Sequence, residues 1–278
     1  MKTNNTDFAK FQQQNAEYYF PYHYIPHIDK DGTVVTHRRS GFGGYEYYAY
    51  MLHVKSVVDK LNPNSLLDIG CGDGVFINMM KNHVNRVKGV DLSEGAIFFA
   101  KAFYYADVLN TKEVLDNTLV VGTHEFQDKE IFECIDAANL TETFDVVTAI
   151  EVLEHIPEEY IREFFCTLYN RVKDDGSVII TIPTFRSPLS DKHYRHYDIS
   201  TFKHELQKSG VELNVVDYTY IVKQSIFIRF LNSVFHKYWY VDVRFISKIV
   251  WKYYWSKLRF ADEKTGRHLC ITLKRKSG

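Results

Sequence analysis

A glycine-rich loop that follows a short apolar run constrains this chain more than any other feature. Residues 65–76 have the sequence Ser-Leu-Leu-Asp-Ile-Gly-Cys-Gly-Asp-Gly-Val-Phe, with glycine at three alternate positions. The apolar run predicts a buried strand, and the glycines allow a tight turn that brings the backbone close to a ligand. The spacing differs from the dinucleotide fingerprint, since Val75 stands where that motif has glycine, and the Lys-Ser/Thr pair of a phosphate-binding loop is absent. The loop therefore suits a cofactor without phosphates.

Strand and helix patterns alternate along the rest of the chain. Apolar and β-branched runs predict strands at residues 65–69, 87–93, 131–136, 144–150, 177–182, 211–216 and 269–273. Helical periodicity and capping residues predict helices at residues 75–83, 157–172 and 200–209. This alternation predicts an α/β fold, with a parallel sheet covered by helices on both faces. Ligands in such sheets bind at the carboxyl ends of the strands, where four acidic residues fall: Asp68, Asp91, Asp136 and Glu151.

The motifs, in this order and at this spacing, resemble those of the class I methyltransferases that use S-adenosyl-L-methionine (SAM). The resemblance covers residues 64–216 and the final strand. It rests on the glycine loop and on residues 89–93 (Gly-Val-Asp-Leu-Ser), 144–147 (Phe-Asp-Val-Val), 151–155 (Glu-Val-Leu-Glu-His) and 175–177 (Asp-Gly-Ser). It implies a Rossmann-like, seven-stranded methyltransferase sheet and SAM as the cofactor.

The resemblance also implies which residues bind SAM. Residues 68–74 line the methionine end of the cofactor, Asp91 holds the ribose hydroxyls, and Asp136 lies near the adenine amine. The cofactor-binding set implied in this way is Asp68, Gly70, Cys71, Gly72, Gly74, Asp91, Leu92 and Asp136. A Rossmann-like fold without a cofactor is the alternative.

A histidine-rich loop follows the fifth predicted strand, on the side that faces the substrate in this fold. Residues 191–198 have the sequence Asp-Lys-His-Tyr-Arg-His-Tyr-Asp. Histidine has a pKa suited to general-base catalysis at neutral pH, so we predict His196 and His193 as catalytic residues, together with Glu151. The alternative is a structural role, in which histidine and tyrosine side chains fix the loop to the sheet.

The pentapeptide at residues 151–155 admits two interpretations. It resembles sequences in methyltransferases for quinones, sugars and other small molecules. It also resembles the pattern of small-RNA 3′-terminal 2′-O-methyltransferases, in which two glutamates and a histidine join a later histidine, here His196, on a divalent metal. In the metal-free interpretation, Glu151 orients cofactor or substrate, and Glu154 and His155 cap the next helix. We predict transfer without a metal, because the same pentapeptide occurs widely where none is expected.

Two segments fall outside the methyltransferase motifs. Residues 1–50 form an expected N-terminal substrate and cofactor cap, and residues 51–278 form the methyltransferase domain. Within that domain, residues 221–262 form a basic, aromatic insertion, predicted to be helical, before the last strand. All three tryptophans lie in it, and residues 221–260 contain eight Lys or Arg against one acid. Such a segment fits three roles: a lid, a peripheral contact with an anionic membrane, or a contact with an anionic polymer such as RNA.

Composition limits the classes of partner that we expect this chain to bind. A net charge of −1 gives no indication of nucleic-acid binding, and the four cysteines are scattered, without a metal-type pair. The chain shows neither a signal-type apolar segment at its N-terminus nor an apolar run of the roughly 18 residues that span a membrane. We therefore expect a cytoplasmic protein, located peripherally at the inner membrane face if the insertion binds lipid.

The function predicted from these features is methyl transfer to a hydroxyl, less readily to an amine, of a small molecule or glycan. The N-terminal aromatic segment and the basic insertion resemble bacterial methyltransferases of surface-polysaccharide pathways, whose acceptors include lipid-linked sugars. The alternatives are a metal-dependent RNA 2′-O-methyltransferase, a quinone O-methyltransferase, and a non-catalytic SAM-fold binding protein. The last would retain the glycine loop but lack a usable acceptor pocket.

Overall fold

The computed structural model describes residues 43–109, 131–228 and 244–276, together with residue 230 and short pieces at 9–10, 12–13, 27–28 and 34–35. Predictions for most of the N-terminal cap segment and for positions 231–243 of the insertion lie outside the described residues. In the part of the chain that is described, no helix is long and apolar enough to cross a membrane.

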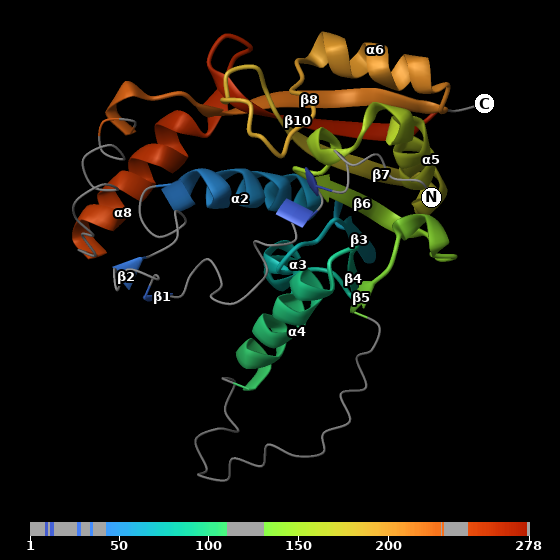
Figure 1. The fold of residues 1–278 in the computed structure, drawn as a ribbon, viewed down its shortest axis with the longest axis horizontal. Coiled ribbons are helices and arrows are strands. Elements are labelled where there is room, and N and C mark those ends of the chain that lie inside the picture. Colours follow the sequence, from blue (N-terminus) through green and yellow to red (C-terminus); the bar gives the residue numbers. More distant parts are fainter. Residues whose placement is uncertain are drawn as a thin grey trace.

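The core is an eight-stranded sheet with the strand order β5-β4-β3-β6-β7-β10-β8-β9 (Figure 1). Neighbours from β5 through β7 are parallel, whereas β10 pairs antiparallel with both β7 and β8. The strands are β3 (Ser65–Ile69), β4 (Arg86–Asp91), β5 (Phe132–Cys134), β6 (Phe144–Ile150), β7 (Val172–Pro183), β8 (Leu213–Lys223), β9 (Phe260–Ala261) and β10 (Gly266–Arg275). This arrangement confirms the predicted Rossmann-like α/β fold. The sheet has eight strands where seven were predicted, because the two-residue β9 adds to the edge of β8.

Helices cover both faces of the sheet (Figure 1). The first face carries α2 (Gly43–Leu61), α3 (Val75–Met80) and α4 (Glu94–Leu109). Side chains such as Val54 and Phe76 are buried there in a core shared with the sheet. The opposite face carries α5 (Ile161–Arg171) and α6 (Ile199–Ser209), where Phe165 and Phe202 belong to a second core. The two apolar cores explain why the strand runs are hydrophobic throughout rather than alternating.

The parallel strands bring distant motifs to one edge of the sheet. The glycine loop follows β3, Asp91 ends β4, Glu151 follows β6, and the histidine-rich loop follows β7. Because these strands are parallel neighbours, their carboxyl ends lie side by side, and this is where ligands bind in such sheets.

The end of β5, at this edge, and the start of β7, at the opposite edge, differ from the predicted bounds. β5 ends at Cys134, because Asp136 caps a short 3-10 helix, η2 (Ala137–Asn139), by accepting a hydrogen bond from the Ala138 N–H at 2.9 Å. β7 begins at Val172 rather than at position 177, since Val172 already pairs with the first residue of β6 ahead of an irregularity in register.

The insertion between β8 and β10 packs against α2. β8 extends through Lys223, so the insertion begins later than position 221. Its described part contains α8 (Arg244–Tyr253) and a π-helical turn, η5 (Tyr254–Leu258). The ring of Tyr45 on α2 lies 5.6 Å from the ring of Trp251 on α8. This aromatic contact supports the interpretation of the insertion as a lid packed on the core.

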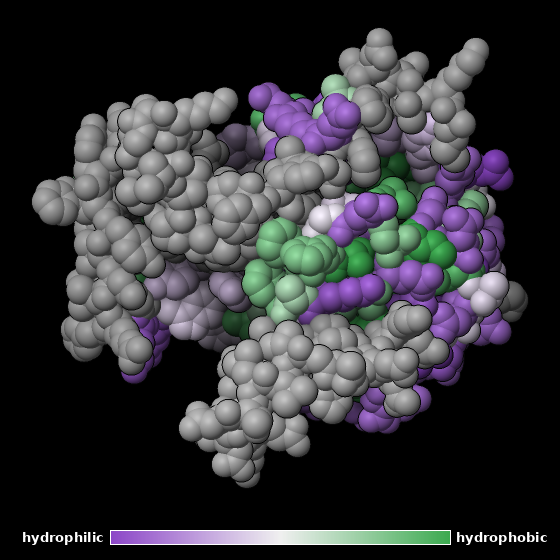
Figure 2. Space-filling model, turned by 60° about the horizontal axis from the view of Figure 1, so that its bottom comes forward, coloured by the Kyte–Doolittle hydropathy of each residue, from purple (hydrophilic) through white to green (hydrophobic). Residues whose placement is uncertain are grey.

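Large apolar side chains are also exposed on α4, where Phe98 is 67% and Phe103 38% exposed. α4 lies at the bottom of Figure 1, and Figure 2 shows the molecule with that side turned forward, where apolar and polar residues are interspersed. Neither exposed ring belongs to the predicted site, so this face adds no residue to it.

Candidate active site

The glycine loop adopts a backbone that other residues rarely reach. Gly70, Gly72 and Gly74 have φ values of 69°, 54° and 75°, all in the left-handed region. A Cβ atom at Gly70 would lie 2.7 Å from a methyl group of Val152, and one at Gly74 would lie 2.8 Å from the ring of Phe132. Backbone conformation therefore favours glycine at all three positions, and lack of space requires it at Gly70 and Gly74.

Asp68 is buried beneath this loop, and its carboxylate has a partner. Only 3% of Asp68 is exposed, and its Oδ1 accepts a hydrogen bond from the Thr148 hydroxyl at 2.6 Å. Burial raises the pKa of Asp68 to about 7, and the nearby charge of Asp91 acts in the same direction. The sequence required a partner for this acid, and β6 supplies it.

Asp91 joins the end of β4 to the glycine loop. Its Oδ2 accepts from the Gly72 N–H at 3.0 Å, and its Oδ1 accepts from the Ser93 N–H at 2.8 Å. Burial raises the pKa of this carboxyl as well, while the backbone donors oppose that effect. Leu92, the next residue, is 59% exposed. The carboxylate is thus fixed in place beside an exposed apolar side chain.

The remaining members of the predicted cofactor set are placed differently. Cys71 is buried, and burial raises the pKa of its thiol well above the ordinary value, so this thiol stays protonated. Asp136 is exposed at the end of β5, where its carboxylate caps η2.

On the other side of β6, Glu151 has an unusual backbone and a charged neighbour. Its φ is 55°, and its N–H donates to the Thr181 carbonyl at 2.9 Å. Its Oε2 lies 3.0 Å from Nδ1 of His268 on β10. Its Oε1 is buried and has no hydrogen-bond partner among the described residues. Positive φ in a residue other than glycine clusters at functional sites.

The histidine-rich loop meets the turn after β6. Ligand-type atoms of Glu154, His155 and His193 lie within 4.8 Å of one another, a spacing that could hold a metal ion. His193 Nδ1 in turn shares a hydrogen bond with His196 Nε2 at 2.9 Å. The later histidine of the metal-type group is therefore His193 rather than the predicted His196, which instead hydrogen-bonds to His193. Glu151 is not part of the group, because its carboxylate is turned to His268.

Burial sets the protonation of this cluster. It lowers the pKa of His193 to about 3, with the charges of neighbouring histidines adding to the effect, and it lowers the pKa of His196. Burial also raises the pKa of Glu154, which is 1% exposed and whose Oε2 lacks a partner in the described part of the chain. The two imidazoles are therefore neutral at neutral pH, the form that accepts a proton or binds a cation.

A family model described as a methyltransferase domain matches residues 45–216 of the chain. The chain belongs to this methyltransferase family. This membership agrees with the resemblance that the sequence motifs carry.

Two curated relatives of this methyltransferase match about half of it or less. It is 36% identical to the mitochondrial ubiquinone biosynthesis O-methyltransferase of Schizosaccharomyces pombe over 117 residues. This aligned segment covers 42% of this chain and 36% of the relative. It is 30% identical over 133 residues to the ubiquinone biosynthesis O-methyltransferase of Glaesserella parasuis, covering 47% of this chain and 51% of the relative. The chain thus spans between a third and about half of the length of these relatives.

A solved structure shares the fold over the whole length. The magnesium protoporphyrin IX methyltransferase of Synechocystis PCC 6803, determined with bound SAM, is 14% identical, with a TM-score of 0.52 and coverage of 99% of this chain and 100% of that one. At this identity the likeness concerns the fold.

The loop geometry of the methyltransferase fits SAM. The glycines let the loop pack directly against Val152 and Phe132, and Asp91 presents a fixed carboxylate next to exposed Leu92. A carboxylate at this place suits two adjacent ribose hydroxyls, because it accepts from both.

The sequence analysis did not identify two residues of the site. Glu46 on α2 and His268 at the start of β10 join Glu151, although the three lie more than a hundred residues apart in sequence. An Arg-His pair at the start of a strand was the only local signal, and it does not identify a partner.

A described piece of the predicted N-terminal cap segment contacts the histidine-rich loop. The Lys10 ammonium donates to the His193 carbonyl at 3.0 Å and lies 4.2 Å from the centre of the Tyr194 ring. A piece of the N-terminal segment thus touches the histidine-rich loop, and its role as a cap stays a prediction.

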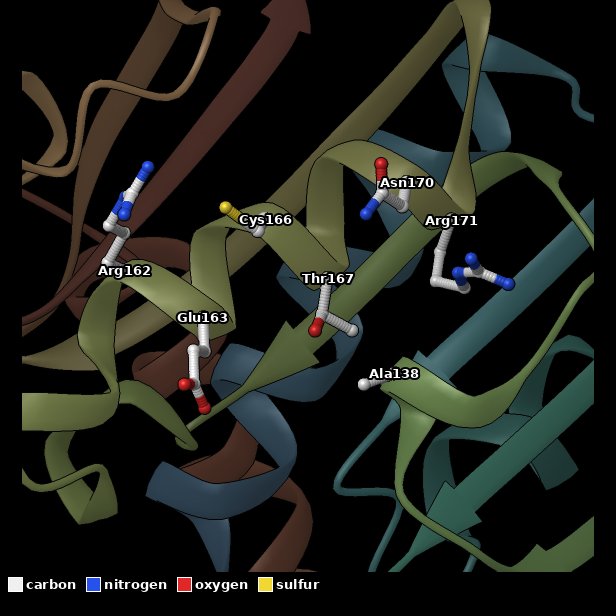
Figure 3. Close-up of a pocket in the computed structure, with 7 residues that line it drawn as sticks. All are labelled: Ala138, Arg162, Glu163, Cys166, Thr167, Asn170 and Arg171. Atoms are coloured by element: carbon white, nitrogen blue, oxygen red, sulfur yellow. The ribbon is translucent and has the colours of Figure 1, made fainter.

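A separate hollow lies on α5, away from these motifs. It has a volume of about 400 Å³ and is lined by Ala138 and six α5 residues: Arg162, Glu163, Cys166, Thr167, Asn170 and Arg171 (Figure 3). It contains no predicted site residue.

Proposed function

We propose that this methyltransferase moves the methyl group of SAM to a hydroxyl of a small molecule or glycan. The observation that carries the proposal is the hydrogen-bonded pair of neutral imidazoles, His193 and His196, on the loop after β7. A hydroxyl must lose its proton as its oxygen attacks a methyl group. Because His193, with a pKa of about 3, is a weak base, we assign this proton to His196, which accepts it through the hydrogen bond between the two rings.

The residues of the chain divide the work between the two sides of β6. The glycine loop, Asp68 and Asp91 hold the cofactor, which supplies an electrophilic methyl group. The imidazole pair takes up the hydroxyl proton and shares it across the 2.9 Å hydrogen bond. Orientation of the acceptor and exclusion of water by the cap and the insertion supply much of the rate.

The acceptor we favour is a sugar or phenol hydroxyl on a lipid-linked molecule, as in polysaccharide biosynthesis. Support comes from the surface around α8, defined here as the insertion surface: apolar Ile226, Phe230 and Ile249 are 85%, 63% and 53% exposed. Lys248 and Lys252 are exposed beside them. The relatives named for ubiquinone biosynthesis support a phenol as the hydroxyl, and they too concern a lipophilic product.

A second candidate function follows from the group formed by Glu154, His155 and His193. A divalent cation held there would polarise the acceptor hydroxyl directly, which fits a quinone-type catechol or a ribose 2′-hydroxyl. The unpartnered Glu154 Oε2 is the observation in its favour.

The test is a methyl-transfer assay on purified protein with labelled SAM and three acceptor panels: sugars, including lipid-linked ones, catechols, and RNA. Mass spectrometry of the ligand retained through purification comes first. We expect label in a hydroxyl of the sugar or catechol panel, and a loss of about 100-fold in kcat for His193→Ala or His196→Ala. The control is His204→Ala, an exposed histidine on α6. Transfer to RNA alone, or full activity in both loop variants, contradicts the proposal.

A further inference from the structure

His268 lies between two carboxylates that come from different parts of the fold. Its Nδ1 is 3.0 Å from Oε2 of Glu151, after β6, and its Nε2 is 2.9 Å from Oε1 of Glu46, on α2. The ring of Tyr50, one turn further along α2, has its centre 4.9 Å from that of the imidazole. Only 7% of His268 is exposed, so the arrangement is shielded from water.

Both nitrogens of this imidazole face acceptors, which determines its protonation. Burial disfavours the charged ring, but the carboxylates of Glu151 and Glu46 outweigh burial and raise the pKa of His268 to about 10. The ring is therefore an imidazolium that donates twice. It cannot serve as a general base, and it differs in this from neutral His193 and His196.

The charged His268 ring fixes the position of the Glu151 side chain. Its Oε2 is held by the imidazolium, its N–H is held by the Thr181 carbonyl, and its backbone is fixed at a φ of 55°. Only Oε1 lacks a partner in the described part of the chain, although it is buried. A buried carboxylate oxygen that is fixed and unpartnered is an acceptor prepared for a ligand.

The direction of the side chain indicates which ligand. The neighbouring residue, Val152, lies against Gly70 of the cofactor loop, whereas Glu151 turns away toward β7 and β10. On that side the charges of Glu151 and His196 act on one another. These contacts place the carboxylate of Glu151 on the side of β7 and β10, away from the glycine loop.

We propose that His268 and Glu46 are positioning residues that fix Glu151 so that its free oxygen binds a hydroxyl of the acceptor. This inference rests on the proposed function for the identity of the acceptor group, and adds how that group is held. Glu151 then contacts the substrate, while His268 and Glu46 act through it. The relay also links α2, and with it the N-terminal cap, to the acceptor site.

The alternative is a purely structural tie between α2 and β10. A matched control exists, because Arg267 Nη1 donates a hydrogen bond of 2.7 Å to Oε2 of Glu46, the carboxylate oxygen that does not bind His268. Arg267→Gln removes one link between the same two elements and leaves both His268 hydrogen bonds in place. A structural role predicts similar defects for Arg267→Gln and His268→Gln.

The experiment compares wild type, His268→Gln, Glu46→Gln and Arg267→Gln. Nitrogen NMR of histidine-labelled protein at neutral pH comes first, with the His268 signals assigned by their loss in His268→Gln. We expect both ring nitrogens to carry protons in the wild type and in Arg267→Gln. For transfer to the acceptor found in the assay above, we expect kcat/KM to fall by about 10- to 100-fold in His268→Gln and Glu46→Gln. The affinity for S-adenosylhomocysteine in calorimetry should stay unchanged, and Arg267→Gln should transfer normally.

The outcomes separate this inference from the proposed function. A singly protonated His268 in the wild type overturns the inference even if methyl transfer is confirmed. Equal kinetic losses in His268→Gln and Arg267→Gln, each matching a loss of thermal stability, also overturn it. If His268 is doubly protonated but no hydroxyl acceptor is methylated, the proposed function is overturned instead. The assignment of Glu151 to an acceptor is then overturned with it.

Discussion

The hydroxyl of Thr148 donates a 2.6 Å hydrogen bond to the carboxylate of Asp68, joining β6 to β3 directly beneath the glycine loop. Both residues are buried, with Thr148 0% and Asp68 3% exposed. This contact lets the strand carry an acid into the interior, where an unpartnered carboxylate would be costly. The contact therefore contributes both to stability and to the shape of the cofactor loop.

The first prediction concerns this bond. Thr148→Val keeps the shape of the side chain but leaves a buried carboxylate oxygen without its donor, so the free energy of unfolding should fall by about 1–3 kcal/mol. Denaturant unfolding measures the change. The control is Thr272→Val on β10, because Thr272 is only half-buried and the same substitution should cost less there. Equal costs at the two sites would mean that the Asp68 contact has no special value.

The second prediction concerns the pH dependence of stability through Asp68. Its pKa in the folded protein is about 7, above the ordinary value of 3.8, because burial disfavours the carboxylate. The folded state therefore binds more protons than the unfolded state between these two values, and stability falls as pH rises across that window. Asp68→Asn removes this dependence. The variant should gain stability relative to wild type as pH rises through the window, as followed by unfolding at several pH values. A constant difference would contradict the raised pKa.

The third prediction tests the cofactor loop. Gly72→Val places a branched side chain on a backbone with φ of 54°, in the loop that approaches the cofactor, and should abolish binding of S-adenosylhomocysteine in calorimetry. The control is Gly210→Ala at the end of α6, where φ is 69° and an added Cβ meets nothing within 4 Å. That variant should lose about 1 kcal/mol of stability from backbone strain but keep its affinity. Undiminished affinity in Gly72→Val would refute the assignment of the loop.

The sequence was most informative where the structure depends on neighbours along the chain. The glycine loop after β3, Asp91 at the end of β4, and helix α6 follow from local spacing. Helix α6 was predicted at residues 200–209 and spans Ile199–Ser209. The capping box of α6 is an example, since the Asp198 side chain accepts from the Thr201 N–H at 2.7 Å. Such contacts span three residues and leave a readable pattern.

Sequence reasoning was least informative where residues meet only through the sheet. β8 and β10 are longer than predicted because each supplies backbone partners for the other, from Leu213 paired with Arg275 to Lys223 paired with Gly266. The same pairing brings His268 next to Glu151, since β10 lies beside β7 and β7 beside β6. No periodicity in the chain reports such contacts, which is why Glu46 and His268 could not be assigned from the sequence.

The fourth prediction concerns metal dependence. We expect methyl transfer to continue in excess chelator, because the neutral imidazole pair can accept the proton without a cation. His155→Ala serves as the companion variant, since it removes one member of the metal-type group and is outside the imidazole pair. Two results together would reverse the order of the two candidate functions. The wild type would lose activity in chelator and regain it with magnesium, manganese or cobalt, and His155→Ala would be inactive.

The fifth prediction concerns the insertion surface. The ring of Phe227 lies 6.1 Å from that of Tyr253, so the segment after β8 and helix α8 form one surface. Lys248 and Lys252 are exposed on α8, and each cation near an anionic leaflet contributes about 1 kcal/mol to attachment. We expect the protein to sediment with anionic but not with zwitterionic liposomes, and salt to weaken the binding, because salt screens exposed charges. Lys248→Glu with Lys252→Glu should lower the partition coefficient by at least about tenfold.

The control for this experiment carries the same change of charge at another place. Lys203 on α6 and Lys274 on β10 are exposed, and neither belongs to the insertion surface. If attachment depends on net charge alone, Lys203→Glu with Lys274→Glu will weaken it as much as the α8 pair does. If attachment depends on the insertion surface, only the α8 pair will weaken it, because the apolar side chains beside those lysines enter the lipid interface together with them. Protein that stays in the supernatant with both kinds of vesicle at low salt would leave the insertion with the role of a lid.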